Sequence, residues 1–96
     1  MVDVIWQQTH ISAHTFERVF SCEVSDVELV WHRDHLPRHI TVCEGSGWQF
    51  QLDNQLPREL NVGDQFEVTA QVYHRLIKGD TDLKLRICES ESMHQE

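Results

Sequence analysis

Long apolar runs and basic residues are what this sequence lacks most clearly. No hydrophobic run approaches the length of a membrane span, and the N-terminus has no basic segment followed by an apolar core. Eight Lys and Arg stand against 16 Asp and Glu, so the formal net charge is −8. Because phosphate neutralisation requires Lys and Arg, we expect neither a nucleic acid nor an anionic membrane surface as a partner.

Cysteine is also scarce. The three residues, Cys22, Cys43 and Cys88, are odd in number and include no Cys-x-x-Cys pair. This spacing predicts neither a disulfide framework nor a zinc ribbon. Reduced thiols are the default in the cytosol, and we therefore expect a soluble cytoplasmic protein.

The length of 96 residues fits one small domain rather than two. A chain of this size buries only about 60–65% of its unfolded surface on folding, so its stability margin is thin. Association with a second copy would cover more apolar surface. We therefore expect a homodimer with Trp6, Trp31 or Trp48 in the symmetric interface.

No segment shows an extended helical period, and short stretches of alternating apolar and polar residues predict an all-β barrel or sandwich. We expect strands over residues 27–34, 38–44, 48–52, 65–68, 72–77 and 83–88, and an edge strand over residues 1–6. Residues 7–14 are polar and indicate a loop. The domain is expected to span residues 1–88, and residues 89–96 to form a disordered acidic tail.

The stretch from Gly63 to His74 reads GDQFEVTAQVYH. A turn at Gly63-Asp64 is followed by a strand-like segment and, after a short loop, by the His. This order resembles the second conserved motif of the cupin family, in which a Gly-Asp turn leads to a strand, a Pro-small-Gly loop and a His. Residues 69–71 (Thr-Ala-Gln) hold the loop positions, so the Pro and the second Gly of the family pattern are missing.

A second pattern lies upstream, as His32-x-Asp34, three residues, Arg38, six residues and Gly45. It resembles the first cupin motif, which is His-x-His, three or four residues, Glu, six residues and Gly. The spacing is the same, but Asp34 stands in place of the second His and Arg38 in place of the Glu. Together the two motifs imply a small, single-domain cupin-like antiparallel β-barrel of the jelly-roll type.

Residues 15–24 fit two periods. Phe16, Val19 and Phe20 have helical spacing, whereas every second residue from Phe16 to Val24 has strand spacing. The resemblance to cupins favours the strand.

Cupins bind a metal ion through the two His and the Glu of the first motif and the His of the second. The resemblance therefore implies a ligand pocket at His32, Asp34, Arg38 and His74. Strand alternation independently places His32 and Asp34 on one face.

Two interpretations of this pocket stay open. In the first, His32, Asp34 and His74 hold one divalent ion, Fe, Mn, Ni or Zn, because two His and one carboxylate suit such ions. In the second, Arg38 repels a metal and pairs with Asp34, and there is no cofactor. The cluster is then a buried polar remnant of an ancestral site, or a pocket whose Arg fork suits a small anionic ligand.

His35 and His39 also lie close together in the sequence. Their spacing suits a metal ion only on a helix, and Pro37 between them opposes a helix. We expect both side chains at the surface.

The function expected from these residues is that of a small cupin domain binding a small polar or anionic molecule in the barrel. One alternative is a metal-dependent dioxygenase or isomerase, so the sequence leaves open whether the protein is an enzyme. Another is a non-catalytic acidic protein that regulates or interacts with other proteins. The fold hosts many unrelated activities and does not select among them.

Overall fold

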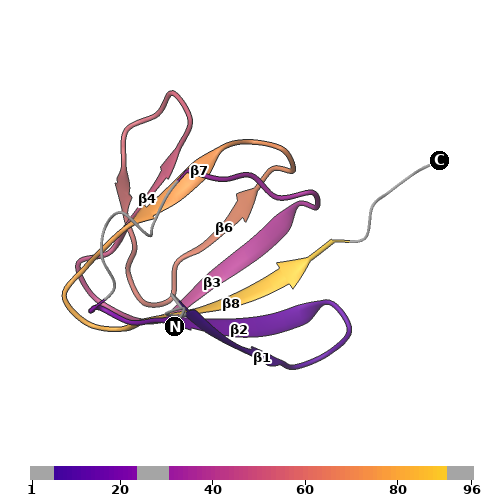
Figure 1. Cartoon of the computed structure of the whole chain (residues 1–96), viewed down its shortest axis with the longest axis horizontal. Coiled ribbons are helices and arrows are strands. Elements are labelled where there is room, and N and C mark those ends of the chain that lie inside the picture. The colour runs from indigo at the N-terminus through magenta and orange to yellow at the C-terminus, as the bar shows by residue number, and fades with distance from the viewer. Residues whose placement is uncertain (1–5, 24–30, 91–96) are drawn as a thin grey trace, which may run out of the picture.

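The computed structural model describes residues 6–23 and 31–90, which form two antiparallel β-sheets around a shared core (Figure 1). The larger sheet holds β1 (Trp6–His10), β2 (Thr15–Phe20), β8 (Leu83–Glu89), β3 (Arg38–Glu44) and β6 (Gln65–Val68), in that spatial order. The smaller sheet holds β5 (Arg58–Glu59), β4 (Gln49–Leu52) and β7 (His74–Ile77). The described residues contain no helix, and the predicted all-β class is confirmed.

The inner face of the larger sheet changes character from one end to the other. On β8, buried aliphatic residues from Leu83 to Ile87 alternate with more exposed ones, and the same alternation puts Glu89 on the inner face. β3 runs antiparallel to β8 with Arg38 opposite Glu89. One end of these strands therefore carries charged side chains into the barrel.

The other end is apolar. Four side chains with at most 2% exposure make up this apolar end: Val42, Trp48, Leu60 and Leu83. The buried Trp48 indole donates a hydrogen bond from Nε1 to the carbonyl oxygen of Thr81, so its polar atom is satisfied. A Cβ at Gly79 would lie 2.4 Å from the backbone nitrogen of Trp48, so the close approach of these two backbones requires glycine.

The loop predicted over residues 7–14 is wrong in its first half. β1 extends to His10 and pairs with β2, with Trp6 opposite Phe20 and Gln8 opposite Arg18. Its polar sequence is explained by its place as the outermost strand of the sheet, where the outer face and one edge meet solvent. Of the edge strand predicted over residues 1–6, only Trp6 lies within the described residues.

The choice of a strand for residues 15–24 is confirmed over the length of β2. Phe16 and Phe20 are both buried, as strand spacing requires. The strand predicted over residues 27–34 is not seen in the part of this range that the structure describes. Residues 24–30 lie outside the described residues, and residues 31–34 form only one isolated bridge, between His32 and His74.

Two predicted boundaries also shift. The strand expected from residue 72 begins at His74, and β8 continues through Glu89, one residue beyond the expected end of the domain. The backbone amide of Glu89 donates to the carbonyl oxygen of His14, which secures this last strand residue. Most of the predicted tail, residues 91–96, lies outside the described residues. No helix able to cross a membrane occurs in the described part of the chain.

Candidate functional site

The backbone brings His32 and His74 side by side at the edge of β7. The amide of each residue donates to the carbonyl oxygen of the other, with N–O distances of 3.0 Å from His32 and 2.8 Å from His74. The two imidazole rings lie 4.4 Å apart, edge to face. His32 is exposed, whereas His74 is 5% exposed and packs against Phe50. One imidazole of the pair thus meets solvent, and the other faces the barrel interior.

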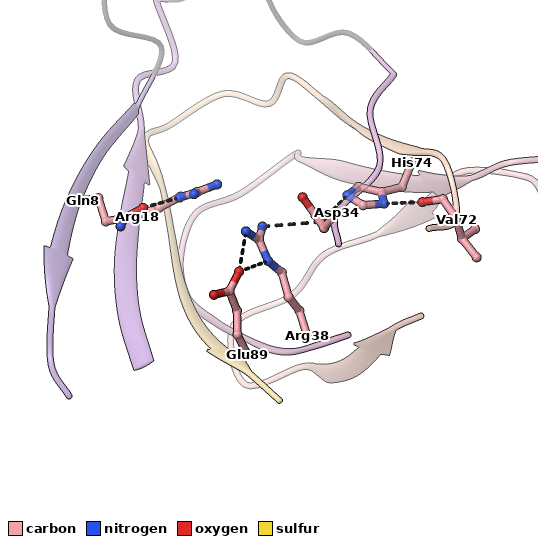
Figure 2. A network of polar contacts seen from close by, with 7 residues as sticks. All are labelled: Gln8, Arg18, Asp34, Arg38, Val72, His74 and Glu89. Carbon is pink, nitrogen blue, oxygen red and sulfur yellow. Dashed lines mark hydrogen bonds and ion pairs between the residues drawn. The ribbon is translucent and has the colours of Figure 1, made fainter. Parts of the chain in front are cut away.

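A hydrogen bond fixes the orientation of the His74 ring. Its Nδ1 lies 2.9 Å from the carbonyl oxygen of Val72, which can only accept, so Nδ1 carries a hydrogen. Nε2 then faces the Asp34 carboxylate and lies 3.2 Å from Oδ2 (Figure 2). A nitrogen lone pair and a carboxylate oxygen repel each other at this distance. A proton shared between the two groups, or a metal ion bound to both, would remove this repulsion.

Asp34 lies between several groups and is only 14% exposed. Its backbone carbonyl accepts a hydrogen bond of 2.8 Å from the amide of Gln71, and its Oδ2 lies 3.4 Å from Nη1 of Arg38. The contacts of Oδ2 with His74 and Arg38 have ion-pair distances. Neither has good hydrogen-bond geometry, so the buried Oδ2 has no hydrogen-bond partner among the described residues. A buried polar atom in this state is uncommon in folded proteins and calls for a further partner.

The charge of Asp34 is favoured by its neighbours. Burial alone raises the pKa of the Asp34 carboxyl, but contact with His74 and the positive charge of Arg38, with smaller contributions from the two imidazoles, outweigh burial. The pKa is consequently lowered from its ordinary value of 3.8. At neutral pH the site contains a carboxylate.

Arg38 has a closer partner than the one predicted. Its Nε and Nη2 donate to Oε2 of Glu89 at 3.0 Å and 2.8 Å, while Asp34 is 3.4 Å away from Nη1 (Figure 2). Glu89 lies in the segment that was predicted to be the tail, so this contact was not expected. The signal was present, because the alternation along residues 83–87 continues to Glu89 and turns it inward.

Arg18 is a second residue that the sequence analysis left out of the site. It lies on β2 between the buried Phe16 and Phe20 and shares their inward-facing side. Figure 2 shows its side chain extending from β2 toward Arg38 and Asp34. The strand spacing of residues 16–24 already grouped Arg18 with the two Phe.

The residues present fit a divalent metal ion. His32, Asp34 and His74 each offer a ligand atom, and these atoms all lie within 4.8 Å of one another. Two imidazoles and a carboxylate suit Fe, Mn, Ni or Zn. The buried Oδ2 of Asp34 and the orientation of His74 both favour a cation between them. Arg38 opposes a second cation, but Glu89 neutralises part of its charge.

The loop that lacks the second Gly of the family pattern keeps the conformation that a Gly would favour. Gln71 has a φ of 67°, in the left-handed region. Its backbone amide holds Asp34, and its side-chain amide nitrogen lies 3.3 Å from Nδ1 of His35. The altered loop therefore still positions both Asp34 and the chain that leads to His74.

The two histidines expected at the surface lie outside this cluster. His35 is exposed, and His39 contacts Glu67 and Gln65 on the neighbouring strand β6. Contact with the Glu67 carboxylate raises the pKa of His39. Neither histidine contributes to the group around Asp34.

No protein-family model matches this sequence, and no curated protein resembles it closely in sequence. Solved structures do match its fold. A cupin domain from Bordetella pertussis is 15% identical, with a TM-score of 0.61, over 90% of this chain and 92% of that chain. An RmlC-like cupin family protein with a double-stranded β-helix fold, from Methanocaldococcus jannaschii, is 12% identical, with a TM-score of 0.61, over 94% of this chain and 92% of that one.

A structure of FeII HppE is also similar, at 17% identity and a TM-score of 0.59, over 79% of this chain but only 41% of that chain. Identities this low show the fold and nothing finer. The chain therefore has the cupin fold, a double-stranded β-helix, as the two motifs predicted.

Proposed function

We propose that this protein binds a small polar or anionic molecule in the barrel, beside a divalent metal ion held by His32, Asp34 and His74. The observation that carries the proposal is the contact between Nε2 of His74 and Oδ2 of Asp34. A metal ion bound to both atoms would remove the repulsion between them, and it would give Oδ2 a partner that it lacks within the described residues.

Several residues would prepare the site for this task. The Val72 carbonyl orients His74, and the Gln71 amide holds the backbone of Asp34. Glu89 accepts two hydrogen bonds from Arg38 and would neutralise part of its charge, although Nη1 of Arg38 stays 3.4 Å from Oδ2 of Asp34. A bound divalent ion would supply a Lewis acid with positions open to an oxygen of the ligand.

Fe(II) is the first ion to test, because the structure of HppE with the same fold is described as its FeII form. The donor set also suits Mn(II), Ni(II) and Zn(II). If the ion is present, a metal-dependent dioxygenase or isomerase is the enzymatic form of this proposal. The predicted cytoplasmic location remains part of the proposal and accords with three free cysteines.

We also propose a homodimer, and the exposure of the three indoles supports one of them as the contact. Trp48 is in the core and Trp6 packs beneath Arg18, so Trp31, at 40% exposure, is the indole best placed for a symmetric contact. Light scattering should show a dimer that Trp31→Ala weakens. A monomer at high micromolar concentration would end this part of the proposal.

The metal is tested on protein purified without chelator, by elemental analysis and thermal unfolding. We expect Fe(II), Mn(II), Ni(II) or Zn(II) to raise the melting temperature of chelator-treated wild type by linkage, and His74→Gln to abolish the shift. His39→Gln, outside the cluster, is the matched control and should keep it. Protein without metal, and without a shift for any of the four ions, would show that the cluster is only structural.

A further inference from the structure

Arg18 occupies a position that normally belongs to the hydrophobic core. Arginine is among the residues least often found facing the interior of a small domain. On β2, however, Arg18 lies on the same face as Phe16 and Phe20, whose exposures are 5% and 6%. Its presence there needs a physical explanation, because burying a cation costs free energy unless the cation gains a partner.

The contacts of the Arg18 guanidinium within the described residues hold it in place but do not pair it with a carboxylate. Nε donates a hydrogen bond of 2.7 Å to Oε1 of Gln8, the cross-strand neighbour on β1, and the group lies 3.9 Å from the centre of the Trp6 ring. These contacts fix the position of the Arg18 guanidinium but provide no negative charge. Within residues 6–23 and 31–90, no carboxylate lies at ion-pair distance from Arg18.

The electrostatic cost of this arrangement is visible in the pKa of Arg18. Burial, together with the nearby charge of Arg38, lowers the pKa to about 10, and Asp34 and Glu89 offset only part of this effect. Arg18 still carries its charge at neutral pH. An anion bound beside it would therefore relieve an existing imbalance.

Arg18 and Arg38 approach the same place from two different strands. The guanidinium carbon of Arg18 lies 5.1 Å from the centre of the Phe16 ring, and that of Arg38 lies 5.6 Å from it. The two arginines differ in their partners, because Arg38 is paired with Glu89 and Asp34. Among the described residues, Arg18 is therefore the cation near this cluster that has no carboxylate at ion-pair distance.

We propose that Arg18 binds the anionic group, a carboxylate or a phosphate, of the small molecule that this barrel takes up. A guanidinium fork matches the oxygens of either group, and a fork already oriented by Gln8 and Trp6 loses little freedom on binding. The inference rests on the proposed function, since it assumes that a ligand enters the barrel beside the His32, Asp34 and His74 cluster. It adds the chemical class of that ligand and the residue that selects it.

The test uses malonate and inorganic phosphate as probes, titrated calorimetrically into full-length protein dialysed free of metal and chelator. Wild type should bind one of them, and the preferred probe distinguishes a carboxylate from a phosphate ligand. Arg18→Met, which keeps an unbranched apolar stem, should bind about tenfold more weakly or worse, because a charge-assisted hydrogen bond is lost. Arg18→Lys keeps the charge without the fork and should fall between the two. Arg86→Met, on the outer side of β8, should bind like wild type.

Two outcomes would overturn the inference. Equal binding by wild type and Arg18→Met would show that Arg18 only packs over Trp6 and Phe16. Binding of neither probe by wild type would show that no anion site exists. Thermal unfolding with Mn(II) separates this failure from that of the proposed function. If wild type gains stability with Mn(II) but binds neither malonate nor phosphate, it has the metal site without the anion site. If it responds to none of Mn(II), malonate and phosphate, it has neither the metal site nor the anion site.

Discussion

The two ends of the barrel both carry inward-facing side chains, but these side chains differ in burial and in how their polar atoms are satisfied. At the apolar end, Trp48 and its neighbours contact other apolar side chains, and the indole nitrogen has a hydrogen-bond partner. The other end contains the polar cluster, which consists of Arg18, Asp34, Arg38, His74 and Glu89. There one buried carboxylate oxygen lacks a hydrogen bond, and the Arg18 guanidinium has no carboxylate at ion-pair distance among the described residues. The first end stabilises the fold, whereas the second gives up stability in a way that is typical of functional sites.

The largest effect should come from the apolar end. Trp48→Ala removes a side chain with 0% exposure and leaves a cavity. We therefore expect the free energy of unfolding to fall by about 3–5 kcal/mol. Trp31→Ala is the matched control, because the same substitution at 40% exposure should change the monomer's stability by less than about 1 kcal/mol. Urea unfolding followed by circular dichroism measures both. Equal losses in the two variants would remove the contrast between core and surface indoles.

At the polar cluster, Arg38→Glu is the most disruptive single change. It replaces the cation between Asp34 and Glu89 with a third carboxylate, and in chelator we expect a loss of about 2–5 kcal/mol. The same change restores the Glu of the family's first motif. Mn(II) should therefore raise the melting temperature of this variant more than that of wild type. Thermal unfolding with chelator and with Mn(II) gives both comparisons.

Two further variants serve as controls for the Arg38→Glu experiment. Arg38→Gln removes the charge without adding a carboxylate, and it keeps the comparison usable if Arg38→Glu does not fold. Arg86→Glu makes the same change at an exposed position and should be far milder. If Arg38→Glu proves as stable in chelator as wild type, the pairs of Arg38 contribute nothing and the polar cluster is better solvated than its burial indicates.

Deleting the C-terminal residues in two steps should separate the polar cluster from the tail. Removal of residues 91–96 should leave the melting temperature nearly unchanged, because the segment is polar and short. Removal of residues 89–96 also deletes Glu89 and leaves Arg38 without its closest partner, which should cost about 1–3 kcal/mol. Differential scanning calorimetry of both truncations decides the matter. Identical melting temperatures would mean that Glu89 belongs to the tail after all.

The smallest expected effect is in the pH dependence of stability. The folded pKa of Asp34 lies below its ordinary value of 3.8, so its ionisation stabilises the fold above that pH. This contribution is lost as the pH falls through the folded pKa. In chelator, the difference in unfolding free energy between wild type and Asp34→Asn should therefore shrink as the pH is lowered from 6 toward 2. A difference that stays constant with pH would assign no titration to Asp34.

The apolar end and the polar cluster were not equally predictable. The period of two from residue 83 onward and the Gly-Asp turn at Gly63 predict β8 and the approach to β6 correctly, because strand alternation is a local property. The two motifs likewise predicted the cupin fold. Residues 7–10 were misjudged because an edge strand needs few apolar side chains.

The sequence by itself determined the all-β class and the motif positions that hold His32, Asp34, Arg38 and His74. Only the tertiary structure decided which charges meet. Arg38 and Glu89 are 51 residues apart, and they become partners because β3 and β8 pair in one particular register. Arg18 reaches the same region because β2 lies on the other side of β8. Ion pairing depends on distances of a few ångströms across strands, and no local pattern in the sequence records those distances.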